Sequence, residues 1–269
     1  MEQEQTILFT VSGAVAHVCL NRPDKHNALN TLLIDALQST FDLLGTAPDI
    51  RVIVLRGNGP SFCAGADLHY MHEIAGFGKV ENYKDALKLA RLFDTIYHCP
   101  KPVVALLHGA VMGGANGLAA AADLVIAAQG TRFAFSEVRL GITPATISPY
   151  VIRRCGEAAA RELMLTGRNF DANEALNYRL INVVAPDGKL EDMLTKYVNY
   201  LLAGASGALA ECKRLISDVT NHSGSTTELM PDTASRIAER RASEEGQEGI
   251  KAFFEKRKPN WFKQLNDED

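Results

Sequence analysis

Two glycine-rich segments, each placed directly after an apolar run, constrain the fold more than any other feature of the chain. Residues 61–67 read SFCAGAD and follow the run 52–55, while residues 108–117 read HGAVMGGANG and follow the run 103–107. The apolar runs predict buried strands, and the residues beyond each turn predict a helix. Backbone amides at such turns and at helix N-termini lack intrahelical partners. Two such turns side by side would hold one carbonyl oxygen between two N–H groups, as an oxyanion hole does.

The composition indicates a soluble globular protein and disfavours several other classes of protein. The 269 residues are 46% hydrophobic and 22% charged, which is typical of a soluble globular protein with a substantial core. The polar start and the lack of a membrane-length apolar run predict a cytoplasmic protein without a membrane segment. A formal net charge of −4 disfavours a general nucleic-acid binder. Five dispersed cysteines predict reduced thiols, mostly in the core, and no metal site.

Strand-like and helix-like segments alternate through the first half of the chain, which predicts an α/β fold. Asn30 predicts the N-cap of a helix to about residue 44, and the polar segment 69–79, with two glycines, predicts a mobile loop. The stripe expected on that first helix consists of Leu32, Leu33, Ala36, Leu37 and Phe41. The other elements expected are a hairpin (7–11 and 14–20), helices at 82–97 and 115–122, and strands at 52–55, 103–107 and 124–128.

The second half of the chain is predominantly helical. From about residue 156 onward, strand signals nearly vanish except at 180–184. We find no linker, coiled coil or low-complexity tract in this part. The helices expected here are 157–166, 171–178, 189–203, 206–219, 231–246 and 247–257.

The order of short motifs along the chain resembles the crotonase (enoyl-CoA hydratase/isomerase) superfamily. The motifs are Asn21-Arg22-Pro23, Asn27-Ala28-Leu29, Ala64-Gly65-Ala66-Asp67, Lys101-Pro102-Val103, Gly113-Gly114, Asp123, Ser136-Glu137-Val138, Gly141 and Glu255-Lys256-Arg257-Lys258-Pro259. The resemblance implies a spiral of ββα repeats over residues 1–195 and a helical region over 196–269 that forms a trimer, or a dimer of trimers, and covers CoA. It implies an acyl-CoA substrate and no separate cofactor, because CoA is part of the substrate.

The resemblance also implies which residues carry the chemistry. It places the oxyanion hole on the backbone amides of Ala66 and Gly114. Gly65 can aim the next amide inward, and Gly114 stands at the start of a helix, where the dipole assists. Glu137 matches the second catalytic glutamate of the family, and its apolar and aromatic neighbours predict a raised pKa suited to proton transfer near neutral pH. Asp67 is most simply a helix N-cap.

Gly117 departs from the pattern of the family. Hydratases of this family usually carry another glutamate at this position, three residues after the oxyanion-hole glycine. Members with a single glutamate include enoyl-CoA isomerases and some bacterial hydratases of branched, carboxylate-bearing enoyl-CoA esters. The stretches 136–151 and 243–249 resemble the hydratases of 3-methylglutaconyl-CoA and isohexenylglutaconyl-CoA. A glycine would spare an anionic substrate like-charge repulsion and would leave room for it.

The sequence therefore predicts a hydratase of a branched 2-enoyl-CoA, with 3-methylglutaconyl-CoA favoured and Glu137 as the single acid/base. One alternative is an isomerase of the delta3-delta2 type that uses the same glutamate. Another is a catalytically weak CoA- or RNA-binding homologue.

Further residues are expected to contact CoA. Arg22 and Lys256 match family positions near the phosphates, although a solvated charged surface is the ordinary alternative for both. Ala64 and Leu68 would line the first turn near the adenine and pantetheine. His69 matches a position often held by lysine, which predicts a weaker, pH-dependent phosphate contact.

Overall fold

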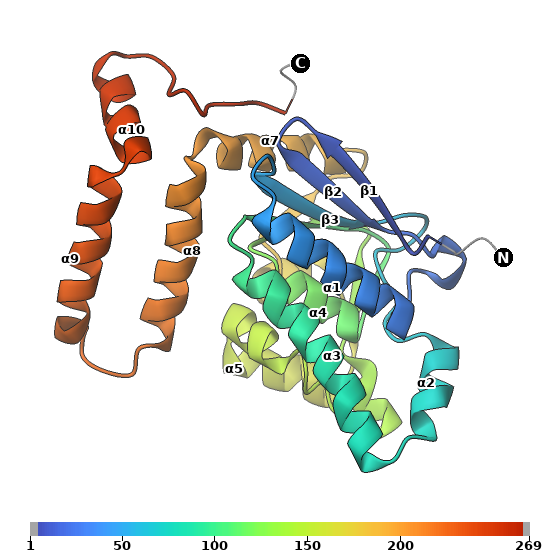
Figure 1. The fold of residues 1–269 in the computed structure, drawn as a ribbon. Coiled ribbons are helices and arrows are strands. Elements are labelled where there is room, and N and C mark those ends of the chain that lie inside the picture. Colours follow the sequence, from blue (N-terminus) through green and yellow to red (C-terminus); the bar gives the residue numbers. More distant parts are fainter. Residues whose placement is uncertain (1–4, 266–269) are drawn as a thin grey trace.

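The computed structural model describes residues 5–265 and shows a sheet covered by helices on both faces, with further helices projecting at one side (Figure 1). Residues 1–4, part of the polar start, lie outside the described residues, as do 266–269. The strands are β1 (Ile7–Ser12), β2 (Val15–Leu20), β3 (Val52–Gly57), β4 (Val103–Leu107), β5 (Ala110–Met112), β6 (Leu124–Ala128), β7 (Arg132–Ala134), β8 (Asn169–Asp171) and β9 (Val183–Ala185). The α-helices are α1 (Thr31–Thr46), α2 (Leu68–Ala75), α3 (Lys79–His98), α4 (Gly114–Ala121), α5 (Ser148–Thr166), α6 (Ala172–Asn177), α7 (Leu190–Ala203), α8 (Ser206–Asn221), α9 (Thr226–Ala242) and α10 (Glu244–Phe254), and short 3-10 helices are η1 (Pro23–Lys25) and η2 (Ser136–Leu140).

Two sheets organise the chain. The larger has the order β1-β2-β3-β4-β6-β9, and within it β1 and β2 pair antiparallel while the other neighbours pair parallel. The smaller has the order β5-β7-β8. The expected hairpin and the α/β class are therefore confirmed. The three-residue strands β5 and β8 are too short to give a periodic signal, and the sequence missed them.

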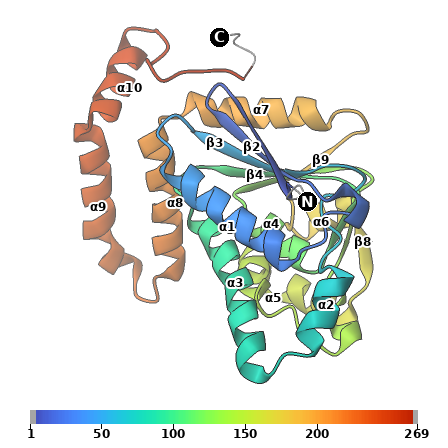
Figure 2. The ribbon, with the colours of Figure 1, turned by 45° about the vertical axis from the view of Figure 1, so that its right-hand side comes forward.

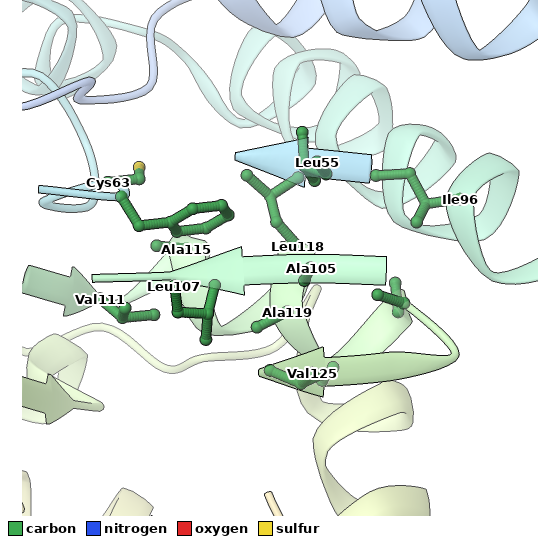
Figure 3. Close-up of a cluster of buried hydrophobic side chains, with 14 of the residues drawn as sticks. Leu55, Cys63, Ile96, Ala105, Leu107, Val111, Ala115, Leu118, Ala119 and Val125 are labelled. Atoms are coloured by element: carbon green, nitrogen blue, oxygen red, sulfur yellow. The ribbon is translucent and has the colours of Figure 1, made fainter. Parts of the chain in front are cut away.

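The larger sheet buries side chains on both faces, which explains why its parallel strands read as continuous apolar runs. On β3, Ile53 and Leu55 join the core with α1, α3 and α4, whereas Val52 and Val54 join the core under α7. Figure 2 shows α1 and α7 on opposite sides of this sheet. Figure 3 shows Cys63 within the first core, where burial raises the pKa of its thiol to about 12.

Two expectations for the first half of the chain are wrong. The segment 69–79 is not a loop, because α2 and the start of α3 occupy it, and its two glycines cap these helices at Gly76 and Gly78. Leu32 is not on the buried stripe of α1, since it is 67% exposed and Ile34 is buried instead. The Asn30 cap itself is confirmed, because its side chain accepts a hydrogen bond from the Leu33 amide at 3.0 Å.

The expected C-terminal helices are confirmed, and most of their ends shift by a few residues. The exception is α5, which begins at Ser148, nine residues before the expected start at 157, and has a break at Gly156, where φ is 78°. Position 195 lies inside α7, which packs on the larger sheet, so a division of the chain at 195/196 stays a prediction. Figure 1 shows α8, α9 and α10 projecting beside the core. Lys213 on α8 ties this projection to the core through an ion pair with Asp123 at 2.6 Å. Between residues 5 and 265, no helix is long and apolar enough to cross a bilayer.

Candidate active site

The two glycine-rich turns lie side by side, as their sequences predict. The Cys63 amide donates to the Ala110 carbonyl, and the Met112 amide donates to the Cys63 carbonyl, each at 3.1 Å. The Phe62 amide adds a third bond, to the His108 carbonyl, at 2.8 Å. These bonds pair the first turn with the backbone around β5, so tertiary structure joins two segments separated by about 45 residues of sequence.

Each turn bends at a glycine with a positive φ. Gly65 has a φ of 97°, and a Cβ atom there would lie 3.1 Å from the Met112 carbonyl oxygen. Gly113 has φ 51° and ψ −122° and is the N-cap of α4. L-residues rarely adopt these conformations, so both positions favour glycine. The next amides, of Ala66 and Gly114, donate to no protein acceptor in residues 5–265.

Leu29 contacts both glycine-rich turns. Its N–H donates to the Gly65 carbonyl at 2.7 Å and its carbonyl accepts from the Asp67 amide at 2.9 Å, so its backbone brackets Ala66. Its side chain faces the second turn, because a Cβ atom on Gly114 would lie 3.1 Å from Leu29 Cδ1. Residues Ala66 and Gly114 thus both adjoin Leu29, and each carries an amide without a protein acceptor among residues 5–265, which is the kind of donor that an oxyanion hole requires.

Arg22 supports the first turn from inside the protein. Its guanidinium is paired with Asp67 at 2.8 Å and donates to the Ala28 carbonyl at 2.6 Å, and the residue is only 7% exposed. Burial and these partners hold its head group in the interior rather than on a solvated surface, and a contact with a CoA phosphate stays a prediction. Asp67 is the N-cap of α2, as expected, since its side chain accepts from the His69 amide at 2.9 Å. Desolvation by burial acts to raise the pKa of the Asp67 carboxyl group. The hydrogen bonds from the Arg22 guanidinium and the His69 amide outweigh this effect, so the pKa lies below its usual value.

Glu137 lies in η2, directly beyond β7, and its carboxyl group faces the second turn. A Cβ atom built on Gly113 would lie 3.3 Å from Glu137 Oε1. The other oxygen, Oε2, is buried without a hydrogen-bond partner within the described chain. Desolvation by burial raises the pKa of this carboxyl group, as its neighbours predict. A half-buried carboxyl group with a free oxygen, beside the turn that carries the free Gly114 amide, can exchange protons with a bound thioester or water.

The raised pKa makes a testable contribution to stability. Below its ordinary value of 4.5, Glu137 is protonated in both folded and unfolded chains. As pH rises, the unfolded chain releases this proton first, so the folded state loses stability until its own raised pKa is passed. We expect Glu137→Gln to match the wild type in Tm near pH 4 and to exceed it near pH 8. The exposed Glu157→Gln is the control, and a Tm difference independent of pH would contradict the prediction.

Gly117 is covered, contrary to the expectation that it leaves room for substrate. A Cβ atom there would press on Ile147 Cγ2 and would lie 2.7 Å from Phe93 Cζ, closer than real Cβ contacts. Ile147 and Phe93 are both fully buried or nearly so. The side of α4 where hydratases carry another glutamate is therefore packed with apolar groups. Position 117 carries no charge, as the sequence shows. The space that a side chain would take there is filled by Ile147 and Phe93 and is not open to a substrate.

This packing predicts a stability defect for Gly117→Ala. The added methyl group overpacks the core, which typically costs about 1–3 kcal/mol, more than the helix gains from replacing glycine. Ile147→Val in the same chain removes one methyl group at the contact and should recover part of the loss. Thermal unfolding of the single and double variants measures both effects, and an undiminished Tm for Gly117→Ala would show that the space is open.

The remaining residues expected at CoA fall into two places. Ala64, Leu68 and His69 lie on the first turn and the start of α2, with Leu68 83% exposed. Lys256 is exposed beyond α10, which Figure 1 places at the opposite end of the molecule from α2. One chain does not bring Lys256 to the first turn. No group of three potential metal ligands occurs within the described residues.

Two contributions to the site were missed from the sequence. Leu29 joins the turns through backbone bonds that its side-chain type does not reveal. Asn116 carries a signal, because it is the single polar side chain in the otherwise glycine- and apolar-residue helix α4. It is fully buried beside the second turn.

Comparisons with known proteins agree with this geometry. A family model described as enoyl-CoA hydratase/isomerase matches residues 10–264. The crystal structure of an enoyl-CoA hydratase from Shewanella pealeana is 38% identical, with a TM-score of 0.92 and 97% of each chain covered. Pseudomonas aeruginosa AtuE is 35% identical, with a TM-score of 0.92 over 96% of this chain and 100% of that one. The trans-2-decenoyl-[acyl-carrier-protein] isomerase of Streptococcus mutans is 28% identical over 95% of this chain and 97% of its own. With these similarities and paired glycine turns bearing free amides, the chain has the crotonase fold and belongs to the enoyl-CoA hydratase/isomerase family.

Proposed function

We propose that this protein adds water to the double bond of a branched 2-enoyl-CoA, and that a carboxylate-bearing ester such as 3-methylglutaconyl-CoA is its preferred substrate. The observation that carries the proposal is the Glu137 carboxyl group, whose buried Oε2 has no partner within the described chain and whose Oε1 faces Gly113. Gly113 precedes the free Gly114 amide. A proton-transfer group and an oxyanion donor therefore adjoin the same peptide unit.

The reaction follows from these groups. The thioester oxygen accepts hydrogen bonds from the Ala66 and Gly114 amides, which stabilise the negative charge that develops on it. Glu137 takes a proton from water as the water oxygen attacks the β-carbon and the double-bond electrons move to the thioester. The resulting enolate then recovers a proton from Glu137 at the α-carbon. Atoms balance, because one water is consumed and Glu137 returns to its starting state.

The choice of an anionic acyl group rests on charge. A second carboxylate near a substrate carboxylate would repel it by about 4 kcal/mol at ~4 Å and an effective dielectric near 20. Gly117 and its apolar cover avoid that repulsion. The name of the Shewanella relative, an enoyl-CoA hydratase, supports hydration as the reaction.

Isomerisation is the second candidate, and the cover over Gly117 favours it. Apolar side chains, those of Ile147 and Phe93, occupy the place where a second glutamate would bind water. An isomerase needs only one base, which carries a proton between two carbons. The Streptococcus relative is named as an isomerase.

A panel of acyl-CoA esters separates the candidates. The purified protein is incubated with 3-methylglutaconyl-CoA, crotonyl-CoA and a 3-enoyl-CoA, and the products are identified by mass. We expect a gain of one water on the first ester and slower hydration of crotonyl-CoA. Products of unchanged mass alone would establish the isomerase, equal rates on both 2-enoyl esters would refute the charge argument, and no turnover would indicate a weak CoA- or RNA-binding homologue.

We also propose that the protein assembles as a trimer or a dimer of trimers and that Lys256 reaches the CoA of a neighbouring subunit. Phe253 and Phe254 at the end of α10 are 78% and 77% exposed, an apolar surface that a further subunit would cover. In the adjoining basic cluster, Arg257 pairs with Glu248 at 2.7 Å and Lys258 Nζ lies 4.1 Å from the Phe262 ring centre, whereas Lys256 has neither contact.

Lys256→Ala should therefore raise the KM for CoA esters more than it lowers kcat, with a larger effect at low salt. Lys251→Ala, on the preceding helix α10, is the control, since Lys251 lies 4.0 Å from Glu255. Steady-state kinetics at two ionic strengths measure the effect. An unchanged KM at low salt would count against a phosphate contact.

A further inference from the structure

Asn116 makes an unusual set of contacts in the first turn of α4. Its Nδ2 lies 2.9 Å from the Ala134 carbonyl oxygen, 3.2 Å from that of Gly113 and 3.3 Å from that of Val111. Its Oδ1 is buried and has no partner within the described residues. The orientation of the amide is determined, because the reverse orientation would turn its oxygen toward three carbonyl oxygens.

These contacts set the orientation of the peptide that joins Gly113 to Gly114. The Gly113 carbonyl accepts from the Asn116 backbone amide at 3.0 Å as well as from Nδ2. The bond is trans, so the Gly114 N–H points opposite to this carbonyl. By holding the carbonyl on the α4 side, Asn116 directs the Gly114 N–H away from α4. Because a glycine backbone adopts many conformations, the side-chain bond adds to the two backbone bonds, from the Gly113 amide to Ala134 and from the Asn116 amide to Gly113, that hold this peptide.

The same side chain ties this peptide to the strand that carries the acid/base group. The Ala134 carbonyl, at the end of β7, accepts both from Asn116 Nδ2 and from the Gly113 amide, each at 2.9 Å. Glu137 follows Ala134 by three residues. Asn116 therefore bonds to the backbone on both sides of the site, next to the oxyanion donor and next to the carboxylate.

We propose that Asn116 is a positioning residue that aligns the Gly114 amide with Glu137. The inference rests on the proposed function, in which that amide receives the thioester oxygen. A side chain needed only to fill space would be apolar, since a buried Oδ1 without a partner is unfavourable. The unfavourable burial of Oδ1 is explained if the Nδ2 hydrogen bonds are required to hold the turn.

The test separates alignment from catalysis by using a ligand that cannot be hydrated or isomerised. Butyryl-CoA with a ¹³C-labelled thioester carbonyl is bound to each protein, and the carbonyl stretching frequency is measured by infrared difference spectroscopy. The wild type should lower this frequency relative to free butyryl-CoA. Asn116→Ala, compatible with an alanine-rich helix, should lose half or more of that lowering. On the best substrate of the panel, its kcat should fall at least ~10-fold while KM changes less than ~3-fold.

Thr131→Val is the matched control, since Thr131 is also fully buried and also donates to backbone carbonyls, those of Leu107 and Ala128. It should keep the wild-type carbonyl frequency even if its Tm falls. No lowering in the wild type would refute the oxyanion hole itself, whereas wild-type lowering kept in Asn116→Ala would refute only the role of Asn116. Asn116→Leu is the second variant, and failure of both variants to fold would assign Asn116 to folding and overturn the proposal.

Discussion

Glu137→Gln is expected to lower kcat at least ~100-fold on the best enoyl-CoA, the usual scale of general acid–base catalysis, while the fold and CoA-ester binding persist. Glutamine keeps the shape of the side chain but cannot accept and return a proton. The α4 position where hydratases of this family carry a second carboxylate is Gly117, covered by Ile147 and Phe93, so we expect Glu137 to act alone.

The proton transfer can be measured apart from the reaction class. Butyryl-CoA in deuterated water exchanges its α-protons if Glu137 removes them, and mass spectrometry follows the exchange whether the enzyme is a hydratase or an isomerase. The wild type should catalyse this exchange and Glu137→Gln should not, with Glu157→Gln as an exposed control. Near-normal turnover by Glu137→Gln would show that another group is the base.

Gly114→Pro is expected to lower kcat by about 10²–10³, because loss of one oxyanion-hole donor typically raises the barrier by about 2.7–4 kcal/mol. Proline removes the amide hydrogen, and the first position of a helix, where Gly114 stands in α4, tolerates proline well. Gly113 has a φ of 51° and a ψ of −122°, outside the right-handed α region that a following proline disfavours. The change therefore removes a donor with little demand on the backbone.

Gly114→Ala is the matched control for this change. It adds a Cβ atom at the same place, 3.1 Å from Leu29 Cδ1, yet it keeps the N–H group. Steady-state kinetics should show a small loss for alanine and a large one for proline. Equal losses would mean that contact with Leu29, rather than the missing hydrogen bond, impairs the enzyme.

The paired turns and the acid/base group were predictable from sequence because local physics determines them. Gly65 and Gly113 mark backbone turns with positive φ. The continuous apolar runs before these turns are typical of parallel strands that are buried on both faces of a sheet. The raised pKa of Glu137 also follows from its apolar neighbours in the chain. Its role came from the resemblance to the family rather than from the residue type.

Other parts of the site could not be predicted because they depend on distant partners. Arg22 was expected near a CoA phosphate, with a solvated surface as the alternative, but Asp67, 45 positions away, pairs with it in the interior. The glycines at 76 and 78 suggested a loop, although they end one helix and begin the next, and α2 is held by the buried Tyr70, which hydrogen-bonds to Asp85 on α3.

The sequence by itself determined the α/β class and the two turns, because backbone conformation and apolar periodicity are encoded by neighbouring residues. Tertiary structure alone decided that the Ala66 and Gly114 amides adjoin Leu29 and that Asn116 binds both sides of the site. It also decided that the space over Gly117 is filled, because Phe93 and Ile147 come from other elements of the fold. Close packing brings together residues that are far apart in the chain, and no local pattern records which of them will meet.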